Sequence, residues 1–399
     1  RRRTAQDVPT MTIVAPDLDQ LTSHEPVGLA THTVEPAAQH PGIAPYGDTE
    51  LSEKQLGELA AELDALRDEL LADIGQRDAD YIRRIVKVQK SLELGARASL
   101  MAGVLPPMWV VGVAMLAASK ILENMEIGHN VMHGQYDWMR DPHLHSSTYE
   151  WDNVCPSSQW KHYHNAVHHQ WTNVRGLDDD LGYGVFRVDP TRKWSPAHAA
   201  QPLIFVALAA LFQYGVGYQD SYAGRPEGQR ADWAWRKPKL METARKIRRQ
   251  WLKDYVAFPA LAAPLGAPSA VAVLSGNAAA NLIRNVWSFS VIFCGHFPDG
   301  VAIFDKADAI DESRGHWYLR QITGSANFTG GRLMDIMSGN LNHQVEHHVF
   351  PDIPANRYAE VAPKLREICG RYGLRYNTGS MPKQFATVVK KICRLALPG

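Results

Sequence analysis

Apolar residues recur at helical spacing along most of the chain, and long apolar segments separate the amphipathic ones. The first amphipathic pattern begins near Ser52, which has capping-box spacing with Gln55. Leucines then predict a helix with a narrow apolar stripe, at Leu56, Leu59, Leu63, Leu66 and Leu70. Residues 1–50 contain six prolines and almost no aromatic residues, so we expect a disordered tail there and one domain over residues 51–399.

Two pairs of apolar segments predict helical hairpins of membrane-spanning length. Ser91–Leu105 and Trp109–Glu123 flank a Pro-Pro turn, and Tyr255–Pro264 and Pro268–Phe297 flank a second proline-rich turn. A membrane span needs about 20 apolar residues, and polar residues interrupt each of these segments. We therefore expect an all-α membrane protein with about four spans, and we expect Pro202–Tyr218 to be an interfacial or re-entrant helix.

The distribution of charge sets the expected orientation. The segment Asp220–Lys253 carries ten Lys and Arg residues against four Asp and Glu residues, which places it in the cytoplasm by the positive-inside rule. Both termini and a helical cap then face the cytoplasm of an integral cell-membrane protein. Lys+Arg and Asp+Glu both total 42, so no basic field indicates nucleic-acid binding. The four cysteines form no CxxC pair, which is typical of a reducing compartment and excludes a thiolate zinc site.

Histidine is the unusual residue, with 17 in the chain. Most of those after residue 128 fall into three clusters: His129-x3-His133, His164-x3-His168-His169 and His343-x3-His347-His348. Residues four apart on a helix point the same way, so each cluster can present imidazoles to one metal. Together with His296, at the end of the last apolar segment, these rings exceed the four ligands of one zinc site and predict two metals. Paired, redox-capable metals bound by imidazole indicate iron and dioxygen.

The histidine clusters and the sequence around them resemble the membrane fatty acid desaturases. In finer detail they resemble the actinobacterial and mycobacterial acyl-CoA (stearoyl-CoA delta-9) desaturases. The resemblance runs from about residue 55 to the end of the chain. It is carried by Glu123-Asn-Met-Glu-Ile-Gly-His-Asn-Val-Met-His133, His164-Asn165, Thr172-Asn173, Gly176-x-Asp-Asp-Asp-x-Gly-Tyr183, Asp254-Tyr-Val-Ala-Phe-Pro259, Ile292-Phe-Cys-Gly-His-Phe-Pro-Asp299 and His343-Gln-Val-Glu-His-His-Val-Phe-Pro351.

The resemblance implies a di-iron centre in a cytosolic cap above four transmembrane helices. The implied iron ligands are His129 and His133 from the first cluster, His164, His168 and His169 from the second, His347 and His348 from the third, and His296 between the last two. In the third cluster many members of the family have Gln-x-x-His-His, which makes Gln344 the matching residue. We favour His343 as the ligand, because imidazole binds iron better than a carboxamide.

Three further positions bear on the metal site. Animal stearoyl-CoA desaturases have an Asn one turn before the ligand that His296 resembles, and this chain has Ile292, so one coordination position is open or filled by water. Glu126 is expected to accept a hydrogen bond from His129, and one of Asp178–Asp180 from the second cluster.

The resemblance implies an oxygen-dependent enzyme that introduces a cis double bond into a long-chain fatty acyl chain, with acyl-CoA favoured over acyl-lipid. No catalytic side chain beyond the metal ligands and no organic cofactor site is expected. The sequence has no flavin, dinucleotide or ferredoxin motif, so electrons would come from a separate NAD(P)H-dependent reductase or ferredoxin-type protein. The alternative is a membrane di-iron hydroxylase of alkyl or acyl chains. Product analysis distinguishes the two enzymes, because a hydroxylase forms a hydroxy acid and a desaturase forms an alkene. A metal transporter or sensor would place histidines inside the spans, whereas these lie at span ends and in loops.

Overall fold

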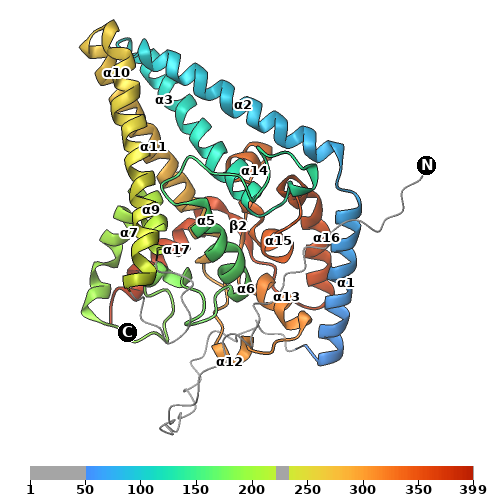
Figure 1. Cartoon of the computed structure of the whole chain (residues 1–399). Coiled ribbons are helices and arrows are strands. Elements are labelled where there is room, and N and C mark those ends of the chain that lie inside the picture. The colour runs from blue at the N-terminus through green and yellow to red at the C-terminus, as the bar shows by residue number, and fades with distance from the viewer. Residues whose placement is uncertain (1–50, 222–232, 399) are drawn as a thin grey trace, which may run out of the picture. The chain divides into compact units, whose positions relative to one another are not determined.

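The computed structural model describes residues 51–221 and 233–398, and the expected disordered tail lies outside these residues. The described chain is mostly helical, as predicted, and it also contains one pair of three-residue strands (Figure 1). Strands β1 (Asn327–Thr329) and β2 (Thr378–Ser380) are parallel, with Asn327 opposite Thr378. The expectation of an all-α chain is therefore correct except for this short ladder.

The α-helices follow in chain order: α1 (Glu53–Ala72), α2 (Gln76–Met101), α3 (Pro106–Ile121), α4 (Asn130–Met132), α5 (Ser157–Trp160), α6 (His169–Trp171), α7 (Gln201–Ala210), α8 (Phe212–Gln219), α9 (Trp233–Trp251), α10 (Phe258–Ala262), α11 (Ala267–His296), α12 (Lys306–Ala309), α13 (Arg314–Thr323), α14 (Arg332–Met337), α15 (Gln344–Val349), α16 (Tyr358–Arg371) and α17 (Met381–Leu395). Three π-helical segments extend neighbouring α-helices: η2 (Leu122–His129), η4 (Lys161–His168) and η7 (Leu252–Ala257). The 3₁₀ segments are η3 (Asp137–Met139), η5 (Leu181–Gly184), η6 (Pro196–Ala200), η8 (Ala263–Leu265), η9 (Leu341–His343) and η10 (Ala355–Arg357).

Helices α2, α3, α10 and α11 pack into a bundle, drawn in blue, teal and yellow in Figure 1. Helices α2 and α3 form the first predicted hairpin, and α10 and α11 form the second, which turns at Gly266 with φ of 110°. Leu100 of α2 packs against Gly112 of α3 and Gly276 of α11, where an added Cβ would come within 2.8 and 2.4 Å of its side chain. These two glycines allow the three helices to approach closely.

Length and apolar composition single out one membrane-spanning candidate among the described residues, Pro106–Met132. The helices Pro196–Ala210 and Phe212–Gln219 pass the same test only when taken together, and they meet at 101°. This sharp bend is consistent with the expected interfacial or re-entrant helix. The four-span topology stays a prediction, because polar side chains such as Arg97, Asn277 and Arg284 lower the hydropathy of α2 and α11.

The cap has its own apolar core, formed by α1, α13, α15 and α16. The predicted capping box is present, because Ser52 accepts from the Gln55 amide and the Gln55 side chain accepts from the Ser52 amide. The predicted stripe is also confirmed, since Leu56, Leu59 and Leu63 are buried against Tyr358 and other cap residues. Helix α11 joins the bundle to the cap, where aromatic residues of α11 and α7 pack together around Phe293.

A buried ion pair fastens the start of α2 to the cap. Arg357 donates to both carboxylate oxygens of Asp78, at 2.6 and 2.7 Å, and both side chains are almost fully buried. We predict that Arg357→Ala lowers the free energy of unfolding by about 3–5 kcal/mol, because Asp78 is left buried without its counter-charge. Thermal unfolding in detergent measures the loss.

The matched control is Arg77→Ala, because Arg77 and Glu360 form an ion pair with both side chains more than half exposed. Removing this exposed pair should change stability by no more than about 1 kcal/mol. Equal effects of the two substitutions would contradict the assignment of the buried pair as a fastening point.

Candidate metal centre

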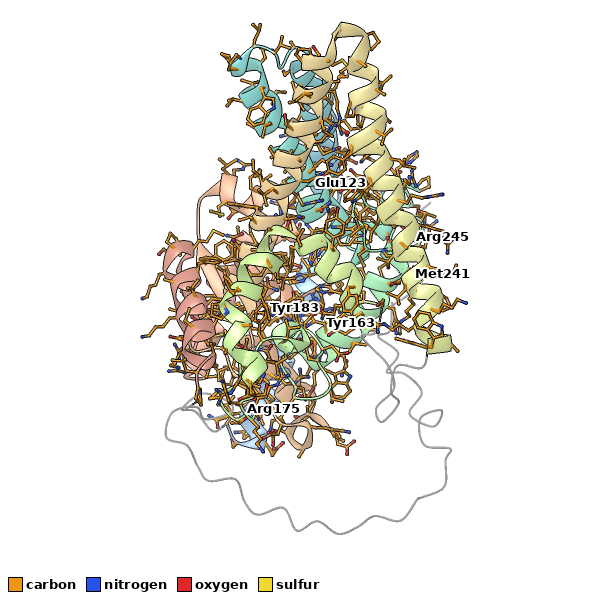
Figure 2. The ribbon with its side chains drawn as sticks, turned by 90° about the vertical axis from the view of Figure 1, so that its left-hand side faces the viewer. Glu123, Tyr163, Arg175, Tyr183, Met241 and Arg245 are labelled. Carbon is orange, nitrogen blue, oxygen red and sulfur yellow. The ribbon has the colours of Figure 1, made fainter. Side chains whose placement is uncertain are left out.

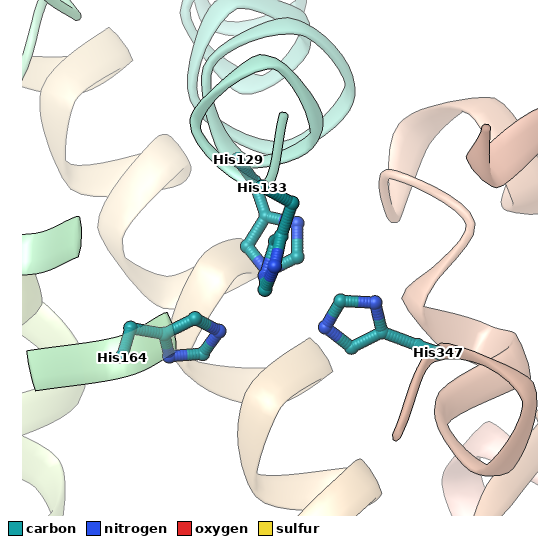
Figure 3. A group of neighbouring side chains, drawn as sticks. All are labelled: His129, His133, His164 and His347. Atoms are coloured by element: carbon teal, nitrogen blue, oxygen red, sulfur yellow. The ribbon is translucent and has the colours of Figure 1, made fainter. Parts of the chain in front are cut away.

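The three sequence clusters meet at one place in the cap. His129, His133, His164 and His347 form one group whose candidate ligand nitrogens all lie within 4.8 Å of one another (Figure 3). His168, His296 and His348 form a second group that meets the same limit. The two groups adjoin, since His347 and His348 are consecutive and the rings of His164 and His168 stack at 5.1 Å. Histidines from four stretches of the chain therefore form two adjacent candidate metal sites.

His169 lies between the two groups. Its ring centroid is 4.7 Å from that of His133 in the first group and 4.5 Å from that of His348 in the second. Its Nε2 lies 3.3 Å from Nε2 of His164.

Two of the π-helical segments end at histidines of the centre. The π-helix η4 closes with a hydrogen bond from the His169 amide to the His164 carbonyl, five residues back. Because a π-turn brings residues five apart onto neighbouring turns, both His168 and His169 lie beside His164. The expected α-helical spacing accounts for His168 alone. The segment η2 ends at His129, and one α-helical turn then carries the chain to His133.

The geometry of the third cluster differs from the expectation that His343 is the ligand. Helix α15 begins at Gln344, and His343 precedes it with a non-helical ψ of 53°, so the four-residue spacing does not place His343 beside His347. Its ring lies in neither group and faces Asp335 and Glu346, at 3.6 and 3.9 Å. Gln344, four residues before His348 on the helix, faces the centre, with Nε2 3.2 Å from Nε2 of His296.

Neighbouring side chains hold the far nitrogen of several rings. His168 donates from Nδ1 to Asp178 at 3.1 Å, as expected for one of the three aspartates. His347 donates from Nδ1 to the Tyr358 hydroxyl at 3.3 Å, and that hydroxyl donates in turn to a backbone carbonyl. His348 donates from Nδ1 to Gln321 at 3.1 Å. These bonds place the lone pair on Nε2 of each ring.

The prediction that Glu126 accepts a hydrogen bond from His129 is wrong. His129 donates from Nδ1 to Asn130 Oδ1 at 3.0 Å, whereas Glu126 accepts from the Tyr81 hydroxyl and the Asn340 amide. The positions of Tyr358 and Gln321 beside their rings follow from tertiary contacts. Only Asn130 has a local signal, because it adjoins the first histidine of its cluster.

The electrostatics of the rings suit metal ligands. Burial lowers the pKa of His164, His169, His347 and His348 well below its ordinary value, so these rings are neutral. Burial also opposes a charge on His168, but the adjacent Asp178 raises the pKa of that ring. Among the described residues, buried nitrogens without a hydrogen-bond partner include Nε2 of His133, His168, His347 and His348. Neutral rings with inward lone pairs and no protein partner fit a pair of bound transition-metal ions.

A cavity reaches the two groups from one side. Its walls include His129, His164 and His296, together with Gln344 and Ile292. Tyr163 and Tyr183, labelled in Figure 2, line its cap side, whereas Glu123 lies nearer the long helices. Apolar side chains from α8, η2 and η9 complete the walls, including Phe212, Val216, Met125 and Leu341. An elongated apolar ligand in this cavity would pass directly beside the imidazoles.

Comparison with known proteins points to one family. The fatty acid desaturase family model matches residues 106–380. Proteins of two Mycobacterium tuberculosis strains, named NADPH-dependent stearoyl-CoA 9-desaturase, are 47% identical over 348 residues, which is 87% of this chain and 82% of theirs. A Synechocystis sn-1 linoleoyl-lipid 6-desaturase is 26% identical over 69% of this chain and 77% of its own. A Diacronema lutheri acyl-lipid (7-3)-desaturase is 28% identical over 54% of this chain and 48% of its own.

We predict that Asp178→Asn lowers the affinity of the centre for metal by about tenfold or more, because His168 loses the carboxylate that fixes its orientation and basicity. Chelator competition on the purified protein, followed by metal analysis, measures the change. The control is Asp68→Asn on the exposed face of α1, far along the chain from the centre. Equal metal retention by the two variants would contradict a role for Asp178 in orienting His168.

Proposed function

The chain belongs to the fatty acid desaturase family, and from that premise we propose that it introduces a cis double bond into a long-chain fatty acyl chain. We propose acyl-CoA as the substrate, dioxygen as the oxidant and two iron ions as the resident metals. The relatives at 47% identity are named for stearoyl-CoA and NADPH, which supports this substrate class and an NADPH-dependent source of electrons. A separate reductase or ferredoxin-type protein would deliver the electrons to the centre.

The observation that carries the proposal is the pairing of the two histidine groups at the wall of one cavity. Removing hydrogen from an unactivated methylene needs a strong oxidant, and iron bound by these imidazoles would supply that chemistry with dioxygen. Eight histidines would hold the metals: His129, His133, His164 and His347 on one side, His168, His296 and His348 on the other, and His169 between them.

The protein positions the acyl chain and excludes water. Apolar side chains such as Phe212, Ile292 and Leu341 line the cavity beside the imidazoles, so an alkyl chain gains free energy by leaving water for this site. Trp160 stacks on His164 with ring centroids 4.2 Å apart and lines the same cavity. These contacts orient both the chain and the ring, and they keep water from the reacting carbons.

We also propose Gln344, in place of His343, as the third-cluster residue nearest the metals. Its side-chain oxygen is buried and has no hydrogen-bond partner among the described residues. Gly295 makes room for it, since a Cβ at that position would lie 2.9 Å from the Gln344 side chain. His343, held by Asp335 and Glu346, would support the shape of the segment before α15.

The membrane arrangement forms part of the proposal. Residues 51–399 would form one desaturase domain, preceded by the tail 1–50, with two hairpins crossing the cell membrane and the cap in the cytoplasm. The apolar helix from Pro106 supports membrane integration. The basic helix α9, which carries Met241 and Arg245 in Figure 2, supports a cytoplasmic position for that side of the cap.

The experiment that tests the function combines metal analysis with a product assay. We expect close to two irons per chain and conversion of stearoyl-CoA to a mono-unsaturated product when NADPH, a reductase system and dioxygen are supplied. The double variant His168→Ala/His169→Ala should lose most of the iron and the activity, because the second group loses His168 and both groups lose the adjacent ring of His169. The control is His143→Ala/His145→Ala, whose rings lie in neither group. Zinc or no metal in the wild type, or a hydroxylated product, would contradict the proposal.

A second experiment compares Gln344→Ala with His343→Ala. We expect Gln344→Ala to retain about tenfold less metal under chelator competition, in the range for residues that support a metal site, and His343→Ala to retain it. Metal is counted per folded chain after gel filtration, so that loss of protein is separated from loss of metal. The reverse pattern would restore His343 as the ligand.

A further inference from the structure

One face of α11 lines the cavity over three helical turns. Arg284, Ser288, Ile292 and His296 are spaced by four residues, and all of them contribute to its wall. At 1.5 Å per residue, this face runs about 18 Å from His296 to Arg284. The segment η2 follows the same course, with His129 near the histidine end and Asn124 beside Arg284. The cavity therefore has a histidine end and an arginine end.

The arginine end is rigid and polar. Arg284 is 2% exposed and donates from Nη1 to Asn124 Oδ1 at 2.9 Å and from Nε to Asn285 Oδ1 at 3.0 Å. Both amides are themselves anchored, because Asn153 also donates to Asn124 Oδ1 and Asn285 donates to the Ala210 carbonyl. An alkyl chain offers no hydrogen bond, so it cannot displace the guanidinium without leaving these polar groups unsatisfied.

A second polar layer lies behind the same end. One turn before Asn124, Lys120 donates to Asp254 at 2.9 Å, and three residues before Arg284, Asn281 donates to the same carboxylate oxygen at 3.0 Å. Beyond this layer the bundle is filled by apolar residues of α2, α3 and α11. At the opposite end, the lining residues His164, Asp180, Tyr183 and Ile292 are only half-buried. These cap-side lining residues are therefore more exposed than Arg284.

We infer that Arg284, held by Asn124 and Asn285, is the closed end of the acyl cavity and sets how many methylenes fit beyond the metal centre. The inference rests on the proposed function, since it assigns the cavity to an acyl chain. A chain that enters from the cap passes the imidazoles and stops where the guanidinium begins. Arg284 is thus a specificity-determining residue for chain length, and it touches the methyl end of the substrate.

The test measures binding of saturated acyl-CoAs of increasing length, from sixteen to twenty-six carbons, to the purified protein by calorimetry in detergent. In the wild type, affinity should rise by about fourfold for each added methylene until the cavity is full, and then level off. In Arg284→Leu the chain length at which affinity stops rising should increase by at least two carbons, because the smaller apolar side chain leaves more room at that end of the cavity. The products formed from mixed acyl-CoAs should shift to longer chains in parallel.

Two variants keep the test decisive. Arg284→Lys retains the charge with a shorter reach, so it should shift the limit in the same direction by a smaller amount if Arg284→Leu does not fold. Val286→Ala changes the exposed outer face of the same helix and should leave the limit where it is.

Three results would separate the possible failures. An unchanged length limit in both Arg284 variants overturns the inference. Weaker binding of every chain length by one common factor also overturns it, because Arg284 would then hold the thioester end of the substrate. Failure of the wild type to bind any acyl-CoA overturns the proposed substrate, and with it the function on which the inference rests.

Discussion

Each imidazole has two nitrogens, and a ring can offer only one of them to a metal, so the protein must hold the other. Asp178, Gln321 and Tyr358 fulfil this requirement for His168, His348 and His347. These partners come from the loop after α6, from α13 and from α16, which are distant in sequence. The packing of the cap therefore has to bring the three elements together before the metal centre can have its geometry.

The same requirement explains why so much of the cap core surrounds α13, α15 and α16. Tyr358 is fully buried. Its hydroxyl accepts hydrogen bonds from Gln135 and from Nδ1 of His347, and it donates one to the Phe350 carbonyl. Its hydroxyl is thus fixed by several bonds, and the ring that it supports has little freedom to rotate. A well-packed core at this position serves stability and metal geometry through the same contacts.

The sequence predicted the parts of the fold that depend on local pattern. The Ser52 capping box and the leucine stripe follow from spacing along a helix. The repeated histidine motif indicated the metal centre, but the meeting of the clusters depends on tertiary packing. It did not predict that α15 begins at Gln344, because the turn that precedes the helix is set by contacts of His343 with Asp335 and Glu346. Hydropathy singles out only the segment from Pro106 in the described bundle, because polar side chains lower the hydropathy of α2 and α11. Some of these side chains pair between helices, as Arg97 does with Asn277, which a window along one segment cannot register.

The π-helical segments limit which changes in chain length the metal centre can tolerate. The segment η4 contains His164 and His168 and closes at His169, and η2 ends at His129. A helix turns by about 100° per residue, so losing or gaining one residue inside either segment would rotate the later ring away from its partners. Substitutions between the histidines leave this rotation unchanged. The composition of these stretches can therefore change without moving the rings, whereas an insertion or deletion within them would displace a ring of the centre.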